Sequence, residues 1–311
     1  MGSGSYSYIN TRTRGAATYA SVTGSSIDSF YDADYATRGV KAASFASALN
    51  QRVFTQTSLD PEMNIKGKVR ESCDSEEHPT SYPIIIGLDV TGSMCDIPSQ
   101  LLINSFPEIM KNVMDSGVEH AQVCFVGIGD CVYDRAPIQV GQFETSDELT
   151  EKWLKKLYLE GGGGGNFGES YSLAWYFAAM HTKIDSFEKR GVKGCLITIG
   201  DEPVLRTTSR HAIETLFGDN VQSDISSEGV LNDASEKWNI YHIDAGNNEH
   251  SWEGFPVNYI HSGRTVNDIS QHIIKCILES YGSASKVAVR GTNTYDVDNK
   301  HSVSEKEDVI L

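Results

Sequence analysis

Three oxygen-bearing side chains stand at alternating positions directly after a short apolar segment. Asp89, Thr91 and Ser93 follow the run at residues 84–88, so one loop carries a carboxylate and two hydroxyls. Hard oxygen ligands of this kind suit Mg²⁺ or Mn²⁺. Taken alone, the pattern is also that of an ordinary turn, in which Asp89 caps the turn and the hydroxyls are loop residues.

Two later segments carry further candidate ligands. Asp201 follows a second apolar run at residues 195–199. A run of five glycines at residues 161–165 leads to Asn166 and Glu169, just before an expected helix. A Glu at that place also simply favours the start of a helix, so its role stays open.

These residues are positioned by apolar runs that predict strands buried on both faces. The expected strands cover residues 84–88, 123–128 and 195–199, which we place at the centre of the sheet, and 138–143, 240–243 and 257–260. Helices are expected between them, where apolar side chains recur every three or four positions. They centre on Leu102–Phe106–Ile109–Val113, Leu149–Trp153–Leu157, Ala174–Phe177–Ala178, residues 209–216, Val230–Ala234–Trp238 and Ile269–Ile273–Cys276–Ile277.

Strands that alternate with helices predict an α/β fold. We expect a three-layer sandwich with a mostly parallel, doubly wound sheet of about six strands. In such sheets ligands bind at the carboxyl ends of the strands. The polar residues that follow each strand are therefore the candidates for chemistry, and we expect their side chains to lie outside the core.

Three regions are expected along the chain. Residues 1–80 are rich in Ser, Thr, Ala, Gly and Tyr, with one weakly helical patch at 38–54. This composition predicts an extended or loosely folded arm, or else irregular structure packed on the next domain. The domain itself is expected at 81–282, with Gly282 ending its last helix. Residues 283–311 are polar and predict a tail.

The composition narrows the classes of function. A formal net charge of −16 argues against general binding to nucleic acid or to an anionic membrane. No apolar run is long enough to span a membrane, and the first nine residues lack the pattern of a signal peptide. The six cysteines form no CxxC pair, which disfavours a zinc ribbon. Their spacing indicates reduced thiols, so we expect a cytoplasmic protein.

The segment Asp89-Val90-Thr91-Gly92-Ser93 resembles the metal-ion-dependent adhesion site of von Willebrand factor A (VWA) domains. That motif is DxSxS, and Thr takes its second place here. The order and spacing of the expected strands from Tyr82 to Gly282 also resemble this family, in its intracellular branch, over about two thirds of the chain. The motif alone is a moderately specific sign of this family. Together with the glycine run and Asp201 it is a strong one.

The resemblance implies a role for each candidate. Thr91 and Ser93 would bind Mg²⁺ or Mn²⁺ through their hydroxyls, and Asp89 and Asp201 would hold it through water. The family's usual third ligand is a Thr in the second loop, which this sequence lacks. Asn166 stands nearest to that place, and some branches have an acidic residue there with a Glu three residues on, where this chain has Glu169.

The resemblance also implies binding rather than catalysis. The expected function is metal-dependent protein–protein interaction, in which an Asp or Glu of a protein partner completes the metal shell. Acidic residues near the site, among them Glu169, Glu202 and Asp96, would favour a partner that brings basic residues alongside.

Three other functions compete with this one. Gly163, Gly165 and Gly168 match the GxGxxG of dinucleotide-binding enzymes, but they follow a helical segment instead of opening the first βαβ unit. A metal-dependent phosphotransferase with Asp89 as nucleophile normally needs a second carboxylate two residues on, where Thr91 stands. A structural or assembly component of a large complex, for example a virion, would bind mainly through the arm and the tail.

Overall fold

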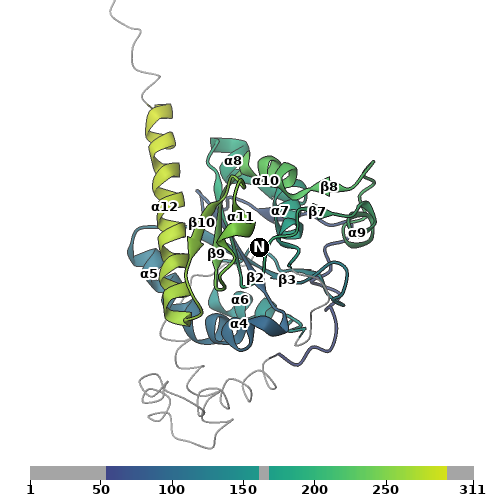
Figure 1. Ribbon diagram of the computed structural model, residues 1–311. Helices are drawn as coiled ribbons and strands as arrows, with labels where there is room; N and C mark the ends of the chain where they lie inside the picture. Colours follow the sequence, from purple (N-terminus) through teal and green to yellow (C-terminus); the bar gives the residue numbers. More distant parts are fainter. Residues whose placement is uncertain (1–53, 161–167, 293–311) are drawn as a thin grey trace, which may run out of the picture.

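A six-stranded sheet forms the centre of the molecule in the computed structural model, which describes residues 54–160 and 168–292 (Figure 1). Its strand order is β10-β9-β6-β2-β3-β4. All neighbours are parallel except β4, which runs antiparallel to β3. The strands are β2 (Tyr82–Asp89), β3 (Ala121–Ile128), β4 (Ile138–Val140), β6 (Gly194–Gly200), β9 (Trp238–Asp244) and β10 (Asn258–His261). The expected mostly parallel sheet of about six strands is confirmed.

The three strands predicted to be central occupy interior positions of this sheet. Every residue of β2, β3 and β6 is buried, as their continuous apolar runs predict. In the register, Leu88 of β2 lies opposite Gly127 of β3 and Ile199 of β6. The strands therefore end together, and the loops that follow β2 and β6 start at the same edge.

Helices cover both faces of the sheet, which gives an α/β sandwich (Figure 1). They are η1 (Gly92–Met94), α4 (Ile97–Gln100), η2 (Leu101–Ser105), α5 (Phe106–Asp115), α6 (Asp147–Leu154), α7 (Tyr171–Met180), α8 (Asp185–Arg190), α9 (Arg210–Leu216), α10 (Ser227–Ser235), α11 (Glu249–Trp252) and α12 (Val266–Thr292).

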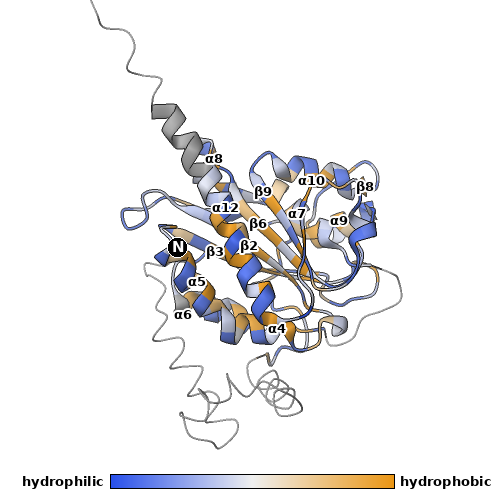
Figure 2. Cartoon of the chain, turned by 60° about the vertical axis from the view of Figure 1, so that its left-hand side comes forward, coloured by the Kyte–Doolittle hydropathy of each residue, from blue (hydrophilic) through white to orange (hydrophobic). Residues whose placement is uncertain are grey.

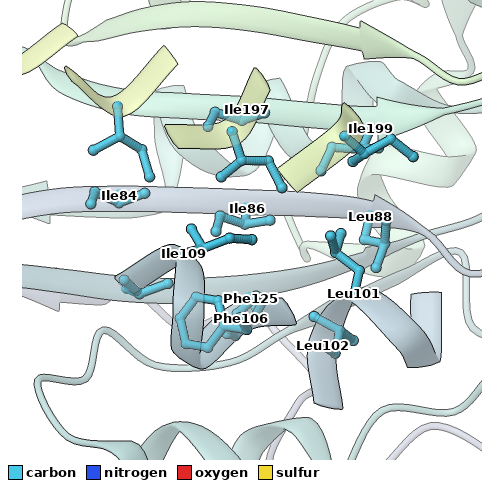
Figure 3. Packing of buried hydrophobic residues seen from close by; sticks show 14 of the residues in the cluster. Ile84, Ile86, Leu88, Leu101, Leu102, Phe106, Ile109, Phe125, Ile197 and Ile199 are labelled. Atoms are coloured by element: carbon cyan, nitrogen blue, oxygen red, sulfur yellow. The ribbon is translucent and has the colours of Figure 1, made fainter. Parts of the chain in front are cut away.

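One face of the sheet packs against α5 and α12. Ile84, Ile86 and Leu88 point to this side and meet the helix residues Leu101 and Ile109 (Figure 3). Phe106 of α5 packs edge-on against Phe125 of β3, with ring centroids 4.7 Å apart. Alternate residues of one strand reach opposite faces, so this half of β2 fixes where α5 lies.

The other face packs against α7 and α10. Ile85 and Leu196 join a second cluster that contains Trp175, Phe177 and Leu231, all fully buried. Figure 2 shows hydrophobic colour along β2 and β6, and mixed hydrophobic and hydrophilic bands along α4, α5 and α12. The strands are thus buried on both sides, whereas these helices present one apolar side to the sheet.

Three helices begin at a residue whose side chain caps the first turn. The Ser146 hydroxyl accepts a hydrogen bond from Leu149 N, and the Ser209 hydroxyl accepts one from Ala212 N. At the start of α12, Asp268 N donates to the Thr265 hydroxyl at 3.1 Å. Each cap satisfies one backbone donor that the first turn leaves without a helical partner.

Several element boundaries differ from the expectation. The strand expected at 138–143 ends at Val140, and Trp238 begins β9 instead of ending a helix. Gly282 does not end α12, which continues to Thr292. A glycine inside a helix costs only about 1 kcal/mol, which is too little by itself to end a helix.

Short strand pairs that the sequence did not predict lie outside the central sheet. β1 (Arg70–Ser72) pairs with β5 (Thr182–Ile184), and β7 (Thr207–Thr208) pairs with β8 (Ile225–Ser226). Strands of two or three residues are too short for a hydrophobic pattern of their own.

The described part of the expected arm, residues 54–80, packs on the domain. Phe54 and Met63 belong to the cluster on the α5 side, and Ile65 belongs to the other cluster. Apart from β1, this stretch has irregular backbone. Residues 1–53 and 293–311, which hold most of the expected arm and tail, lie outside the described residues.

Two further expectations concern the whole chain. All six cysteines are free. Within 54–160 and 168–292, none of the helices is both long enough and apolar enough to cross a membrane.

Candidate functional site

Four of the five predicted ligand residues lie together at the carboxyl edge of the sheet. Thr91 donates to Asp89 Oδ1 twice, from its backbone N at 2.8 Å and from its hydroxyl at 2.7 Å. The Thr91 and Ser93 hydroxyls are 3.2 Å apart, and Ser93 Oγ donates to Asp201 Oδ1 at 2.7 Å. The fifth predicted ligand, Asn166, lies outside the described residues.

Asp201 reaches this cluster because Tyr171 and Asn248 hold the loop after β6 in place. Tyr171, the first residue of α7, donates its hydroxyl to Glu202 O at 3.3 Å. A Cβ at Gly200 would lie 2.0 Å from that hydroxyl oxygen, so the close approach requires glycine at this position. Asn248 Nδ2 also donates to Asp201 O at 2.7 Å.

Asp89 is completely buried, contrary to the expectation that the site side chains lie outside the core. The reason is its place as the last residue of β2, between β3 and β6, where the sheet itself covers it. Its Oδ2 atom has no hydrogen-bond partner among the described residues. A buried ionised carboxylate normally has a partner, so half of this group lacks its usual compensation.

Glu169 and Asp130 are two further buried carboxylates with an oxygen that accepts no hydrogen bond from the described residues. They are 6% and 3% exposed, and Glu169 Oε2 and Asp130 Oδ2 likewise lack partners among the described residues. Glu169 is tied to the loop after β6, because its backbone N donates to Pro203 O at 2.9 Å. Gly168 permits this contact: its φ is +153°, and a Cβ there would lie 2.7 Å from Pro203 O. Asp130 follows β3, so Asp89 and Asp130 come from neighbouring strand ends, whereas Glu169 precedes α7.

Burial and mutual repulsion shift the acid–base equilibria of the site. Burial raises the pKa of Asp89 to about 7, against the opposing effect of the Thr91 hydrogen bonds, and the charges of Asp201 and Glu202 raise it further. Burial, followed by the charge of Asp89, raises the pKa of Glu169 to about 9. The site thus gathers carboxyl groups whose ionised forms its own hydrogen bonds leave uncompensated.

The donor set fits a hard divalent cation. Two hydroxyls, the unpartnered Asp89 oxygen and the Asp201 carboxylate are oxygen ligands of the kind that Mg²⁺ takes. Within the described residues, no group of three or more His, Cys, Asp or Glu side chains is arranged to hold a metal ion. A cation here would therefore depend on the hydroxyls and on bound waters, which Mg²⁺ commonly keeps.

Arg264 is a site residue that the sequence reasoning missed. Its Nη1 donates to Asp201 Oδ2 and its Nη2 to Ser93 O, both at 2.5 Å, and the side chain is 47% exposed. The hydrogen bond to Asp201 raises the pKa of the guanidinium. A signal was present: Arg264 follows β10 at the same edge as the other candidates.

Comparisons with known proteins leave the family of the chain open. No protein-family model and no curated protein matches the sequence. Among solved structures, the fold is similar to two crystal structures of the pilus adhesin SpaC from Lactobacillus rhamnosus GG, one of them in the open conformation. Each has a TM-score of 0.42 and 10% sequence identity over 72% of this chain. The chain spans about a third of the adhesin's length, 31% in one structure and 32% in the other.

Proposed function

We propose that the chain carries a doubly wound domain of the von Willebrand factor A type that binds a protein partner through a divalent cation. The observation that carries the proposal is the buried, unpartnered Asp89 Oδ2 beside the Thr91 and Ser93 hydroxyls. A cation is the simplest group that would compensate that oxygen. The sheet and the helices on its two faces support the fold part of the proposal.

The residues of the cation site have distinct tasks. Thr91 and Ser93 would supply hydroxyl ligands, while Asp89 and Asp201 would neutralise the ion and orient its waters. A bound Mg²⁺ would supply a position that a carboxylate of the partner enters. A bound cation would favour the ionised form of Glu169, and the charge of that carboxylate would then help to retain the ion. Because Mg²⁺ prefers six oxygen ligands in octahedral geometry, the contact would be directional.

Two features support binding over phosphoryl transfer. An attacking carboxylate must expose an oxygen to its substrate. Asp89 is 0% exposed, and its Oδ1 already accepts two hydrogen bonds from Thr91. No second carboxylate stands two residues on to move a proton. We therefore propose that the domain is not an enzyme.

Isothermal titration calorimetry with Mg²⁺ and Mn²⁺ tests the proposal. We expect one site in the wild type and no detectable binding for Asp89→Ala or Asp201→Ala. Asp233→Ala is the matched control, because Asp233 is an exposed aspartate on α10. Circular dichroism on each variant separates the loss of a ligand from the loss of the fold. Absence of binding by the folded wild type at millimolar metal would refute the cation site.

A further inference from the structure

A polar groove of about 740 Å³ starts beside the candidate cation site and runs along the outside of the molecule. One wall is the segment α4–η2–α5, and the other is the loop before α12 with the first turns of that helix. Figures 1 and 2 both show α12 beside α4 and α5. Asp96 and Arg264 lie at the end near the cation site, where Arg264 contacts Asp201 and Ser93.

The two walls run in the same direction. The segments after β2 and β10 both start at the carboxyl edge and return along the same face of the sheet. Along one wall the lining extends from Asp96 to Asn112, through continuous helical structure. At about 1.5 Å per residue this wall is about 24 Å long. An extended peptide rises by about 3.3 Å per residue, so about seven residues would fill the groove.

Side-chain amides dominate the polar lining. Asn104, Asn112, Asn267 and Gln271 line the groove, and none of their side chains has a hydrogen-bond partner within the described part of the chain. A carboxamide both donates and accepts, so it matches the alternating N–H and C=O groups of an extended backbone. The apolar lining residues that the structure describes are Ile97, Ile109, Val266 and Ile274, with no aromatic side chain among them, and polar residues outnumber them.

Charge gives the groove a direction. Arg264 is the one basic side chain among its described lining residues and stands at the cation-site end, which it shares with Asp96. Its guanidinium is ion-paired with Asp201 but remains 47% exposed, so it can still bind an acidic group. Glu108 is exposed and lies twelve residues along the helical wall from Asp96, a rise of about 18 Å. A ligand with an acidic group at one end and a basic group about five extended residues away would complement both charges.

We propose that this groove binds an extended segment of the protein partner, with an acidic side chain at Arg264 and a basic side chain near Glu108. The proposal deepens the proposed function and rests on it only for the cation beside Arg264. The carboxamides hold the backbone of the segment, and the charges at Arg264 and Glu108 fix its direction and register. The partner is therefore a protein with an exposed, unstructured stretch of mixed charge.

Selection from a phage-displayed library of random heptapeptides, in millimolar Mg²⁺, tests this inference. We expect enrichment of peptides that carry Asp or Glu and, several positions away, Lys or Arg. Fluorescence anisotropy with a selected peptide then compares two variants on α12. Gln271→Trp fills the groove and should weaken binding at least about tenfold. Lys275→Trp is the matched control, because Lys275 is exposed on the same helix outside the groove lining, and it should leave affinity unchanged.

Arg264→Ala should remove the preference for an acidic residue when the selection is repeated. Selected peptides without charge preference, or peptides that bind Gln271→Trp as tightly as the wild type, would overturn the inference. Calorimetry with Mg²⁺ alone separates the two proposals. If the wild type binds no Mg²⁺ but binds a peptide that Gln271→Trp no longer binds, the groove proposal stands and the cation-site proposal is refuted. If the wild type binds Mg²⁺ but selects no peptide, the cation-site proposal stands and the groove proposal is refuted.

Discussion

Two buried aspartates of this molecule occupy equivalent places at strand ends but differ in how many hydrogen bonds their carboxylates accept. Asp89 ends β2, Asp244 ends β9, and both are 0% exposed. Asp244 accepts from Gly246 N at 2.7 Å, from Asn248 N at 2.8 Å and from the Tyr259 hydroxyl at 2.6 Å. Both of its oxygens are thus used by its own surroundings.

Within residues 54–160 and 168–292, Asp89 accepts only from Thr91, and only through Oδ1. The difference separates a structural carboxylate from a candidate ligand. Asp244 orders the loop that presents Asn248, whose side chain then holds Asp201 O. Asp89 Oδ2 lacks a hydrogen-bond partner among the described residues, at the edge of the sheet where the Thr91 and Ser93 hydroxyls and the Asp201 carboxylate lie together. A burial value alone would not have distinguished the two residues; the hydrogen-bond partners do.

The largest expected effect is on stability at the satisfied aspartate. Asp244→Ala would leave two backbone N–H groups and one hydroxyl without their acceptor, so we expect a loss of about 3 kcal/mol or more in the free energy of unfolding. Urea denaturation measures it, with the exposed Asp233→Ala as control. A loss no larger than that of the control would show that these hydrogen bonds do not make Asp244 a structural residue.

Asp89→Asn is expected to act in the opposite direction. Without added metal it removes a buried charge that lacks compensation, so the free energy of unfolding should rise by about 1–2 kcal/mol near pH 8. Added Mg²⁺ should stabilise the wild type, because it binds the folded state, and should no longer stabilise the variant. Differential scanning calorimetry with and without Mg²⁺ compares them. Destabilisation of the metal-free variant would contradict the comparison of the two aspartates.

The pH dependence of stability should reveal the same uncompensated charge. Asp89 and Glu169 have pKa values of about 7 and about 9, raised from ordinary values of 3.8 and 4.5. Between about pH 4 and pH 9 the folded state therefore binds more protons than the unfolded state, and the metal-free protein loses stability as the pH rises. Thermal midpoints across this range, with chelator and with Mg²⁺, measure the effect. Mg²⁺ should flatten the profile. A flat profile in the presence of chelator would be evidence against an uncompensated charge at Asp89 and Glu169.

Arg264→Ala carries the smallest expected effect. The guanidinium is a positive charge bonded to Asp201, so its removal should strengthen Mg²⁺ binding. Because the side chain is 47% exposed, solvent screens the interaction and we expect a gain of only about two- to fivefold. Calorimetry at low and high salt measures it, and the gain should shrink as salt increases. Weaker Mg²⁺ binding would mean that Arg264 holds Asp201 in place for the cation.

The hydrophobic pattern of the chain predicts which segments form the sheet and where the polar loops begin. The apolar runs at residues 84–88, 123–128 and 195–199 became interior strands, because such runs are stable only when buried on both faces. The alternation of Asp89, Thr91 and Ser93 placed its oxygens on one loop, and Asp201 had to join them because parallel strands end at one edge.

The hydrogen-bond partners of each of those groups, in contrast, depend on long-range packing. The isolated oxygen of Asp89 and the three partners of Asp244 follow from what lies opposite each strand end, and the two residues look alike in sequence. Arg264 reaches Ser93 across 171 positions of the chain. The groove exists because α5 and α12, far apart in sequence, return along the same face of the sheet. Hydrogen bonds and grooves depend on such long-range neighbours, whereas strand and helix patterns depend on residues nearby.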